Sequence, residues 1–154
     1  MKNSISAKEK VKKLESMLVT LDSLAGIGFK HQSSKHVASK GPAGESYELL
    51  LSGDNNISVE FTFYPAFGDK SDYVVIYVID NKADKDFSLD SWMQKRGVVS
   101  LESPFKLSSY TGEYDQQLSE FLEFVNALFN EAELRAVLEG KVWIDVKFNW
   151  GDIK

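Results

Sequence analysis

Residues 57–64 read ISVEFTFY, and this stretch decides the fold. Apolar and polar residues alternate along it, which is typical of a β-strand with one face in a core and one face in water. A second strand-like run, SYELLL at residues 46–51, precedes it across the turn-forming residues 53–55, Gly-Asp-Asn. Two such runs around a tight turn predict a β-hairpin.

The next strand-like run, residues 73–79, reads YVVIYVI with no alternation. Such a run is typical of a strand that is covered on both faces, so we expect it in the centre of the sheet with helices on at least one side. Residues 80–86 read as a polar loop. Further strands are expected at residues 28–37 and 98–101. A last strand is expected at residues 141–150, with these residues on one side: Val142, Ile144, Val146, Phe148 and Trp150.

An N-terminal helix is predicted from Ser6 to Gly26. Ser6 followed by Glu9 forms a capping-box pattern, apolar residues then recur at helical spacing, and Gly26 stands where a C-terminal glycine belongs. The exposed-loop composition of residues 39–44 predicts no helix or strand there.

Three further helices are predicted in the second half of the chain. A short one begins after the cap residue Ser88, and a long one spans residues 112–129 with an apolar face. Asn130 followed by Glu133 repeats the capping pattern and predicts a brief helix that ends at Gly140.

These elements predict one α+β domain over residues 1–154. Most of the strands follow one another in hairpin-like succession, so the sheet is expected to be mainly antiparallel, with the N-terminal helix and the C-terminal helices packed on it. A parallel sheet would need crossover helices between the middle strands, which the sequence lacks. A chain of 154 residues with 43% hydrophobic content can bury one sizeable core.

Charge is distributed unevenly along the chain. Residues 1–40 hold eight lysines and three acidic residues, a balance of +5, whereas residues 41–154 carry a balance of −10. Residues 107–134 contain six acidic residues and no lysine or arginine. Four of these acids lie in the first turns of predicted helices, where the helix dipole favours negative charge: Glu113, Asp115, Glu131 and Glu133. The remaining pair, Glu120 and Glu123, lies in mid-helix and suggests a basic partner.

Composition also limits the classes of function. The absence of cysteine excludes disulfides, thiolate metal sites and a cysteine nucleophile. The acidic body disfavours contact with nucleic acid or an anionic membrane, except through the basic N-terminal segment. The N-terminus has no apolar signal core and the longest apolar run is too short to cross a bilayer, so we expect a soluble, cytoplasmic protein.

The residues that could support catalysis form no catalytic pattern. His31 and His36 are five residues apart, which on a regular strand sends them to opposite faces, and nearby lysines would repel a metal cation. The carboxylates of residues 80–86 have lysines interleaved and lack calcium-loop spacing. No Gly-x-Ser-x-Gly motif is present. We therefore predict no enzyme activity, cofactor or metal site, although the number of carboxylates leaves a small hydrolase or nuclease open.

Two aromatic residues stand next to acids, as residues at protein interfaces often do. Trp143 precedes Asp145 on the polar side of the last predicted strand, and Phe67 precedes Asp69 in a predicted loop. Burial of either aromatic in the core is the alternative. Trp92 is expected to pack inward. The predicted partner-binding residues are Glu120, Glu123, Trp143, Asp145, Phe67, Asp69 and Asp72.

A small, acidic, cysteine-free and aromatic-rich α+β domain resembles the bacterial immunity proteins of polymorphic-toxin and contact-dependent inhibition systems. That resemblance implies a cytoplasmic antitoxin that binds a cognate toxin domain, often a basic nuclease, and blocks it by occlusion. An acidic secretion chaperone for an effector segment is the alternative binding function, and it implies a homodimer with exposed apolar grooves.

Overall fold

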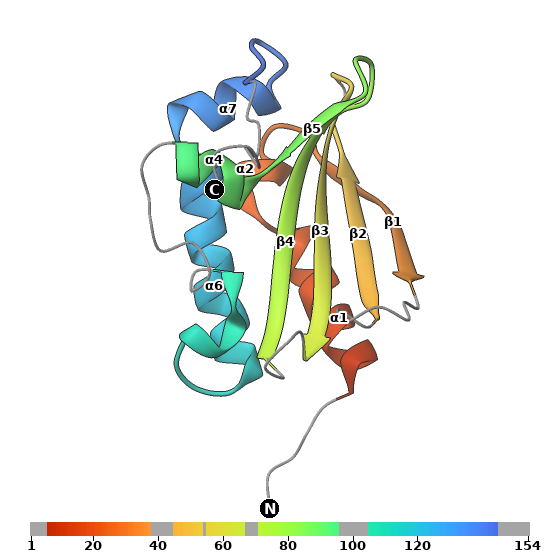
Figure 1. Cartoon of the computed structure of the whole chain (residues 1–154), viewed down its shortest axis with the longest axis vertical. Coiled ribbons are helices and arrows are strands. Elements are labelled where there is room, and N and C mark those ends of the chain that lie inside the picture. The colour runs from red at the N-terminus through yellow and green to blue at the C-terminus, as the bar shows by residue number, and fades with distance from the viewer. Residues whose placement is uncertain (1–5, 38–44, 54, 67–70, 96–104, 145–154) are drawn as a thin grey trace, which may run out of the picture.

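The computed structural model describes residues 6–37, 45–53, 55–66, 71–95 and 105–144 (Figure 1). Two helical segments precede the strands, and the remaining helices follow them. The elements in chain order are α1 (Ala7–Leu18), α2 (Asp22–Ala25), β1 (Lys30–Val37), β2 (Ser46–Ser52), β3 (Ile57–Ala66), β4 (Ser71–Asp80), β5 (Lys85–Ser88), α4 (Leu89–Lys95), the 3-10 helix η1 (Leu107–Ser109), α6 (Tyr114–Phe129) and α7 (Ala132–Leu138).

The five strands form one antiparallel sheet in which each strand pairs with its neighbour in the sequence, in the order β1-β2-β3-β4-β5. The predicted hairpin is confirmed, because β2 pairs with β3 from Tyr47 opposite Phe63 to Ser52 opposite Ser58. Asn56 adopts a φ of 68° in its turn, a left-handed conformation that asparagine tolerates better than most residues. The predicted α+β class with an antiparallel sheet is therefore confirmed.

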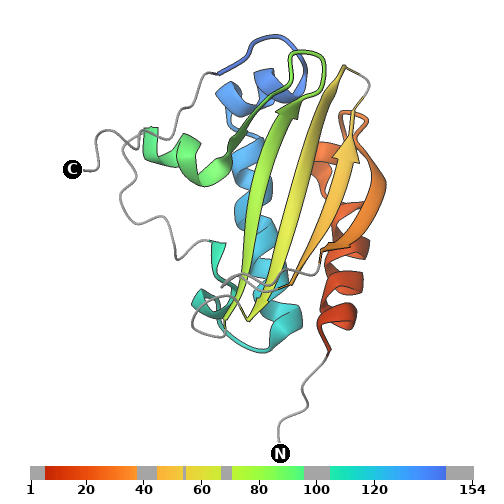
Figure 2. The same ribbon diagram turned by 45° about the vertical axis from the view of Figure 1, so that its right-hand side comes forward.

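The helices α1 and α6 lie on the same face of the sheet (Figures 1 and 2). The strands present alternate residues to this face, and the central ones are fully buried: Val59, Phe61, Phe63, Val74, Ile76 and Val78. They share one hydrophobic core with the apolar sides of α1 and α6, to which Leu14, Leu18, Leu118, Phe121 and Val125 belong. At roughly 1.5–3 kcal/mol for each fully buried large apolar side chain, this inner face dominates the stability of the fold.

The predicted N-terminal helix is interrupted. Ser6 caps α1 as expected, since its hydroxyl accepts the backbone N–H of Glu9, but α1 ends at Leu18. The next two residues are β-branched, and Thr20 donates its hydroxyl to the Met17 carbonyl at 2.9 Å, a local bond that competes with helix continuation. The chain resumes as the four-residue helix α2, so the prediction of one helix up to Gly26 is wrong in this detail.

The prediction that residues 73–79 are covered on both faces is wrong. Val74, Ile76 and Val78 are buried on the helix side, whereas Val75, Tyr77 and the other outward residues are only half-buried. The helices that the structure describes all lie off the outer face (Figures 1 and 2). The apolar run reflects a half-exposed surface of β-branched and aromatic residues. The strand β4 is the fourth of five and pairs on both sides, because part of the predicted polar loop forms the edge strand β5.

The predicted strand at residues 141–150 does not begin as proposed. Gly140 has a φ of +76° and ends α7 as predicted, and Lys141 donates its backbone N–H to the Ala136 carbonyl, which closes the helix. Val142 is 52% exposed although Ile144 is buried, so these residues do not share a covered face. Residues 141–144 form no strand, and residues 145–150 lie outside the described part, as does the predicted strand at residues 98–101.

The start of α7 also differs from the prediction. Its N-cap is Glu131, one residue later than expected, and Asn130 is the C-cap of α6 instead. The Asn130 side chain accepts a hydrogen bond from Arg135 at 2.8 Å. Earlier in the chain, Ser88 caps α4 as predicted, by accepting the backbone N–H of Ser91 at 3.3 Å. Within the part of the chain that the structure describes, no helix has the length and apolar character needed to cross a membrane.

Candidate partner-binding surfaces

Four of the seven predicted partner-binding residues lie in the described part of the chain. Asp72 is the second residue of β4, Glu120 and Glu123 lie on α6, and Trp143 follows α7. The other three fall outside the described residues: Phe67, Asp69 and Asp145. The four described residues lie in three separate parts of the chain and have different surroundings.

Asp72 is engaged inside the fold. Its carboxylate forms an ion pair of 2.6 Å with Lys10 on α1, and its side chain is only 13% exposed. The Lys10 ammonium lies 5.4 Å from the centre of the Tyr114 ring, and the Tyr114 hydroxyl donates to the Lys10 carbonyl at 2.7 Å. Burial, with Asp72 and Asp115 adding to it, raises the pKa of Tyr114 above its usual range. This group of residues joins α1, β4 and α6.

Other acids of the acidic stretch also have partners inside the fold. Asp115 pairs with Lys13 of α1 at 3.0 Å, so the basic N-terminal segment neutralises part of the acidic body of its own chain. Glu133, in the first turn of α7, accepts a hydrogen bond of 2.7 Å from the indole N–H of Trp92. Trp92 is 1% exposed and packs inward as predicted, so this bond connects α4 to α7.

Glu120 and Glu123 differ from these acids. Glu120 accepts hydrogen bonds from the Gln116 amide at 3.0 Å and the Thr111 hydroxyl at 3.2 Å, both of which are neutral groups. Burial and the nearby Glu120 carboxylate raise the pKa of Tyr110 to about 12. Glu123 is exposed. In the described residues, neither carboxylate forms an ion pair with a lysine or arginine.

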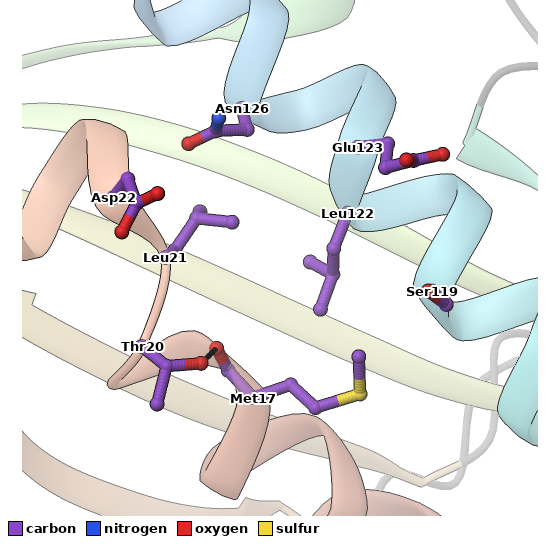
Figure 3. A pocket seen from close by; sticks show the side chains of 8 residues that line it. All are labelled: Met17, Thr20, Leu21, Asp22, Ser119, Leu122, Glu123 and Asn126. Carbon is purple, nitrogen blue, oxygen red and sulfur yellow. Dashed lines mark hydrogen bonds between the residues drawn. The ribbon is translucent and has the colours of Figure 1, made fainter.

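Glu123 lies at the rim of a small cleft between the α1–α2 segment and α6 (Figure 3). The cleft has a volume of about 180 Å³, which is below the range of about 300–1,000 Å³ for small-molecule sites and suits a single side chain. Leu21, Leu122 and Met17 point into it, and Asp22 and Glu123 lie on opposite sides of its rim (Figure 3). An apolar floor below two carboxylates matches the methylenes and the charged end of a lysine or arginine.

Trp143 is half-buried and packs on the edge of Phe87, with the ring centres 5.3 Å apart. It also lines a polar pocket of about 340 Å³ next to Lys82 and Lys141. The structure thus combines the two alternatives for this residue, because one side of the indole belongs to the core and the other lies beside an open pocket. The neighbouring Val142 is among the most exposed apolar residues of the described part.

The two histidines lie on the same face of β1, against the prediction. A β-bulge between His31 and Ser33 adds a residue to the strand, so His31 pairs with Leu51 and His36 with Tyr47, both on the helix side of β2. His31 lies 3.3 Å from Glu15 of α1, whereas His36 stacks on Tyr47 and contacts Glu45. No group of three or more histidine, aspartate or glutamate side chains suited to a metal is found among the described residues.

The outer face of the sheet is a surface that sequence reasoning missed. We call it the uncovered sheet face, and it consists of residues of β2 to β5 that point away from the helices. At its centre Glu60 of β3 lies between Leu50 of β2 and Tyr77 of β4. The small side chains of Ser58 and Thr62 beside Glu60 are buried. The face as a whole contains Glu48, Leu50, Ser58, Glu60, Thr62, Tyr64, Val75, Tyr77, Ile79 and Asp86.

This face carries a negative charge that its own residues do not balance. Burial raises the pKa of Glu60, and the Glu48 and Asp86 carboxylates add to that effect; the hydrogen bond from Thr62, at 2.7 Å, and the cation Lys35 act in the opposite direction. Burial likewise raises the pKa of the Tyr77 phenol, with a contribution from Glu60. The only signal of this face in the sequence was the polar half of the ISVEFTFY alternation, which sequence reasoning took as a solvent-exposed side.

Comparisons of the chain with protein-family models, with curated proteins and with solved structures gave no match.

Proposed function

We propose that this protein is a protein-binding inhibitor of the immunity-protein class, which acts in the cytoplasm by binding a cognate basic toxin domain and occluding it. It acts by complex formation and performs no chemistry on the partner. An acidic surface suits such a role because it attracts a cationic partner, accelerates the encounter and imitates the phosphates of a nuclease substrate.

The observation that carries the proposal is the set of acids at the cleft between α1–α2 and α6. Asp22 and Glu123 flank an apolar floor, and Glu120 lies one turn from Glu123 on α6. Of these three carboxylates none has a lysine or arginine partner in the described residues, although Lys10 and Lys13 of the nearby α1 pair with other acids. Like charges a turn apart on a helix oppose each other by roughly 0.2–0.5 kcal/mol, which a cationic partner would relieve.

The proposal is tested by isolating the partner and then perturbing the cleft. A pull-down from the source cells, with the product of an adjacent toxin gene as first candidate, should yield a tight one-to-one complex that abolishes the toxin's activity. Binding only to the extended N-terminal segment of an effector would support the secretion chaperone instead. Failure to bind any basic protein, together with turnover of a substrate by the chain alone, would refute the inhibitor function.

The double variant Glu120→Lys/Glu123→Lys should fold normally and lose affinity mainly through slower association. We expect the association rate to fall by about tenfold or more at low salt and to lose most of its salt dependence, because electrostatic steering is screened over about 10 Å at 0.1 M salt. The control Glu9→Lys/Glu45→Lys makes the same change of net charge at two residues that do not line the cleft. Equal association rates for the two double variants, measured by stopped flow, would contradict a specific role of the cleft.

A further inference from the structure

The uncovered sheet face has the properties of a docking surface rather than those of a plain solvated surface. Most of its residues are half-buried, although Ser58 and Thr62 are buried and Asp86 is exposed, and most are aromatic, β-branched or acidic. The helices of the described part all lie off it (Figures 1 and 2). Half-buried aromatic residues around a central charged group are typical of interface hot spots, because the surrounding side chains keep water away from the central contact.

The register of the strands decides which groups lie side by side on this face. Glu60 of β3 is directly opposite Tyr77 of β4, and Tyr64 lies four residues after Glu60 on β3. Cross-strand neighbours have their Cβ atoms about 4.5–5.5 Å apart, so a planar cation that stacks on the Tyr77 ring can also reach the Glu60 carboxylate. Thr62 donates a hydrogen bond to one carboxylate oxygen, Oε2, which can accept a second one, and the other oxygen accepts no hydrogen bond from the described residues.

The charges on the face select the sign of the occupant. Three carboxylates contribute to it, Glu48, Glu60 and Asp86. On the same side of the edge strand β1 the register places Lys30, opposite Ser52, and Lys35, opposite Glu48, so the acids exceed the bases by one, and Lys35 is the lysine that acts on Glu60. A cationic side chain would compensate this excess, and an anionic ligand would increase the repulsion. Guanidinium fits better than ammonium, because it is planar, stacks on aromatic rings and donates two parallel hydrogen bonds to a carboxylate.

We propose that the uncovered sheet face binds an arginine-bearing segment of a partner protein, with the guanidinium stacked on Tyr77 and paired with Glu60. This surface is on the other side of the sheet from the cleft at α6, and the inference does not depend on the proposed inhibitor function. The apolar residues Leu50, Val75 and Ile79 lie beside this central pair and contact the aliphatic part of the arginine and its neighbours.

The first experiment titrates the full ¹⁵N-labelled chain with a hexa-arginine peptide and follows backbone amide shifts. Saturable shifts should concentrate on β3 and β4 around Glu60 and Tyr77, and hexaglutamate should produce none. Hexalysine should bind at least threefold more weakly. Shifts confined to the α6 cleft, shifts that do not saturate, or equal binding of the two basic peptides would overturn the inference.

The second experiment uses variants of single residues. Glu60→Gln keeps the shape of the side chain and should lower the affinity for the hexa-arginine peptide by at least fivefold. Tyr77→Leu should lower the affinity to the same extent by removing the aromatic ring. The matched control Glu113→Gln removes one charge from an exposed residue that precedes α6 and should leave binding unchanged. Binding of Glu60→Gln equal to that of the parent chain would refute the central contact.

Thermal unfolding provides a separate readout, because the ionised Glu60 carboxylate should lower the stability of the fold. A carboxyl whose pKa is raised on folding contributes stability below the pKa of the unfolded chain, ordinarily 4.5, and loses that contribution as the pH rises through the folded value. Glu60→Gln should therefore raise the melting temperature at pH 7 but not at pH 4. A variant that melts at a higher temperature yet binds more weakly marks a residue kept for binding. A lower melting temperature at pH 7 would contradict this reasoning.

Discussion

The substitution Asp72→Asn should lower the stability of the fold and leave partner binding unchanged. The sequence placed Asp72 among the partner-binding residues, whereas in the structure its carboxylate pairs with Lys10 at 2.6 Å. The two side chains are 13% and 24% exposed, which places the pair between two regimes. Exposed pairs contribute roughly 0.2–1 kcal/mol, and loss of one partner of a fully buried pair costs roughly 3–5 kcal/mol.

An intermediate cost of about 2 kcal/mol follows, since Asp72→Asn leaves the Lys10 ammonium partly buried beside the Tyr114 ring. In a chain of this size that corresponds to a decrease of about 4–8 °C in melting temperature. A matched control is the pair between Lys13, which like Lys10 lies on α1, and Asp115 of α6; these two side chains are 41% and 71% exposed. Asp115→Asn should cost about 0.5 kcal/mol or less.

The assay is urea unfolding of four chains: the parent, Asp72→Asn, Lys10→Met and the double variant. A double-mutant cycle isolates the energy of the pair from the separate effects of each substitution, and a coupling of about 1–2 kcal/mol is expected. A coupling below about 0.3 kcal/mol, within the usual error of additivity, would show that the pair contributes nothing. A loss of partner affinity with stability unchanged would return Asp72 to the binding surface.

Two further predictions concern stability. Ser23 is 1% exposed and its hydroxyl has no hydrogen-bond partner in the described residues. Ser23→Ala should therefore raise the free energy of unfolding, measured by urea titration, by about 1 kcal/mol. A decrease instead would indicate that the hydroxyl has a partner. Tyr110 should ionise at about pH 12. The fold should lose stability between pH 10 and 12, because Tyr110 ionises at a lower pH in the unfolded chain than in the folded one. The absorbance difference between the parent and Tyr110→Phe at alkaline pH measures the ionisation of Tyr110, and a midpoint near pH 10 would contradict the prediction.

Local periodicity correctly predicted the elements whose sequence pattern depends only on neighbouring residues. The alternation along residues 57–64 and the capping box at Ser6 depend on neighbours in the sequence. The strand β3 formed where expected, and α1 began where expected. The prediction for β4 was wrong because an unbroken apolar run describes composition and not coverage. Only the position of the helices determines whether the outward residues Val75 and Tyr77 are buried, and that position is a property of the whole fold.

The candidate sites were harder to predict because charges find partners far away in the sequence. Asp115 pairs with Lys13, 102 residues earlier, and Asp72 with Lys10, 62 residues earlier. The lack of nearby cations in the sequence pointed to Glu120 and Glu123, and the fold supplies neither with a cation in the described part. Proximity in the sequence gave no sign that Asp72 pairs with Lys10. The same limit concealed the bulge in β1, since an inserted residue becomes visible only in the pairing with β2.

Stability measurements can separate the acids that fold the protein from those that serve binding. An acid that the fold uses, such as Asp72 beside Lys10, stabilises the native state, and its neutral analogue should lower the melting temperature. An acid held half-buried among other acids, such as Glu60, opposes folding at neutral pH, and its neutral analogue should raise it. If this surface bound no partner, nothing would offset the stability that the ionised Glu60 costs the fold. A cationic partner would offset that cost on binding. The sign of the stability change on neutralisation, measured at pH 7 for each acid, therefore indicates which surface meets the partner.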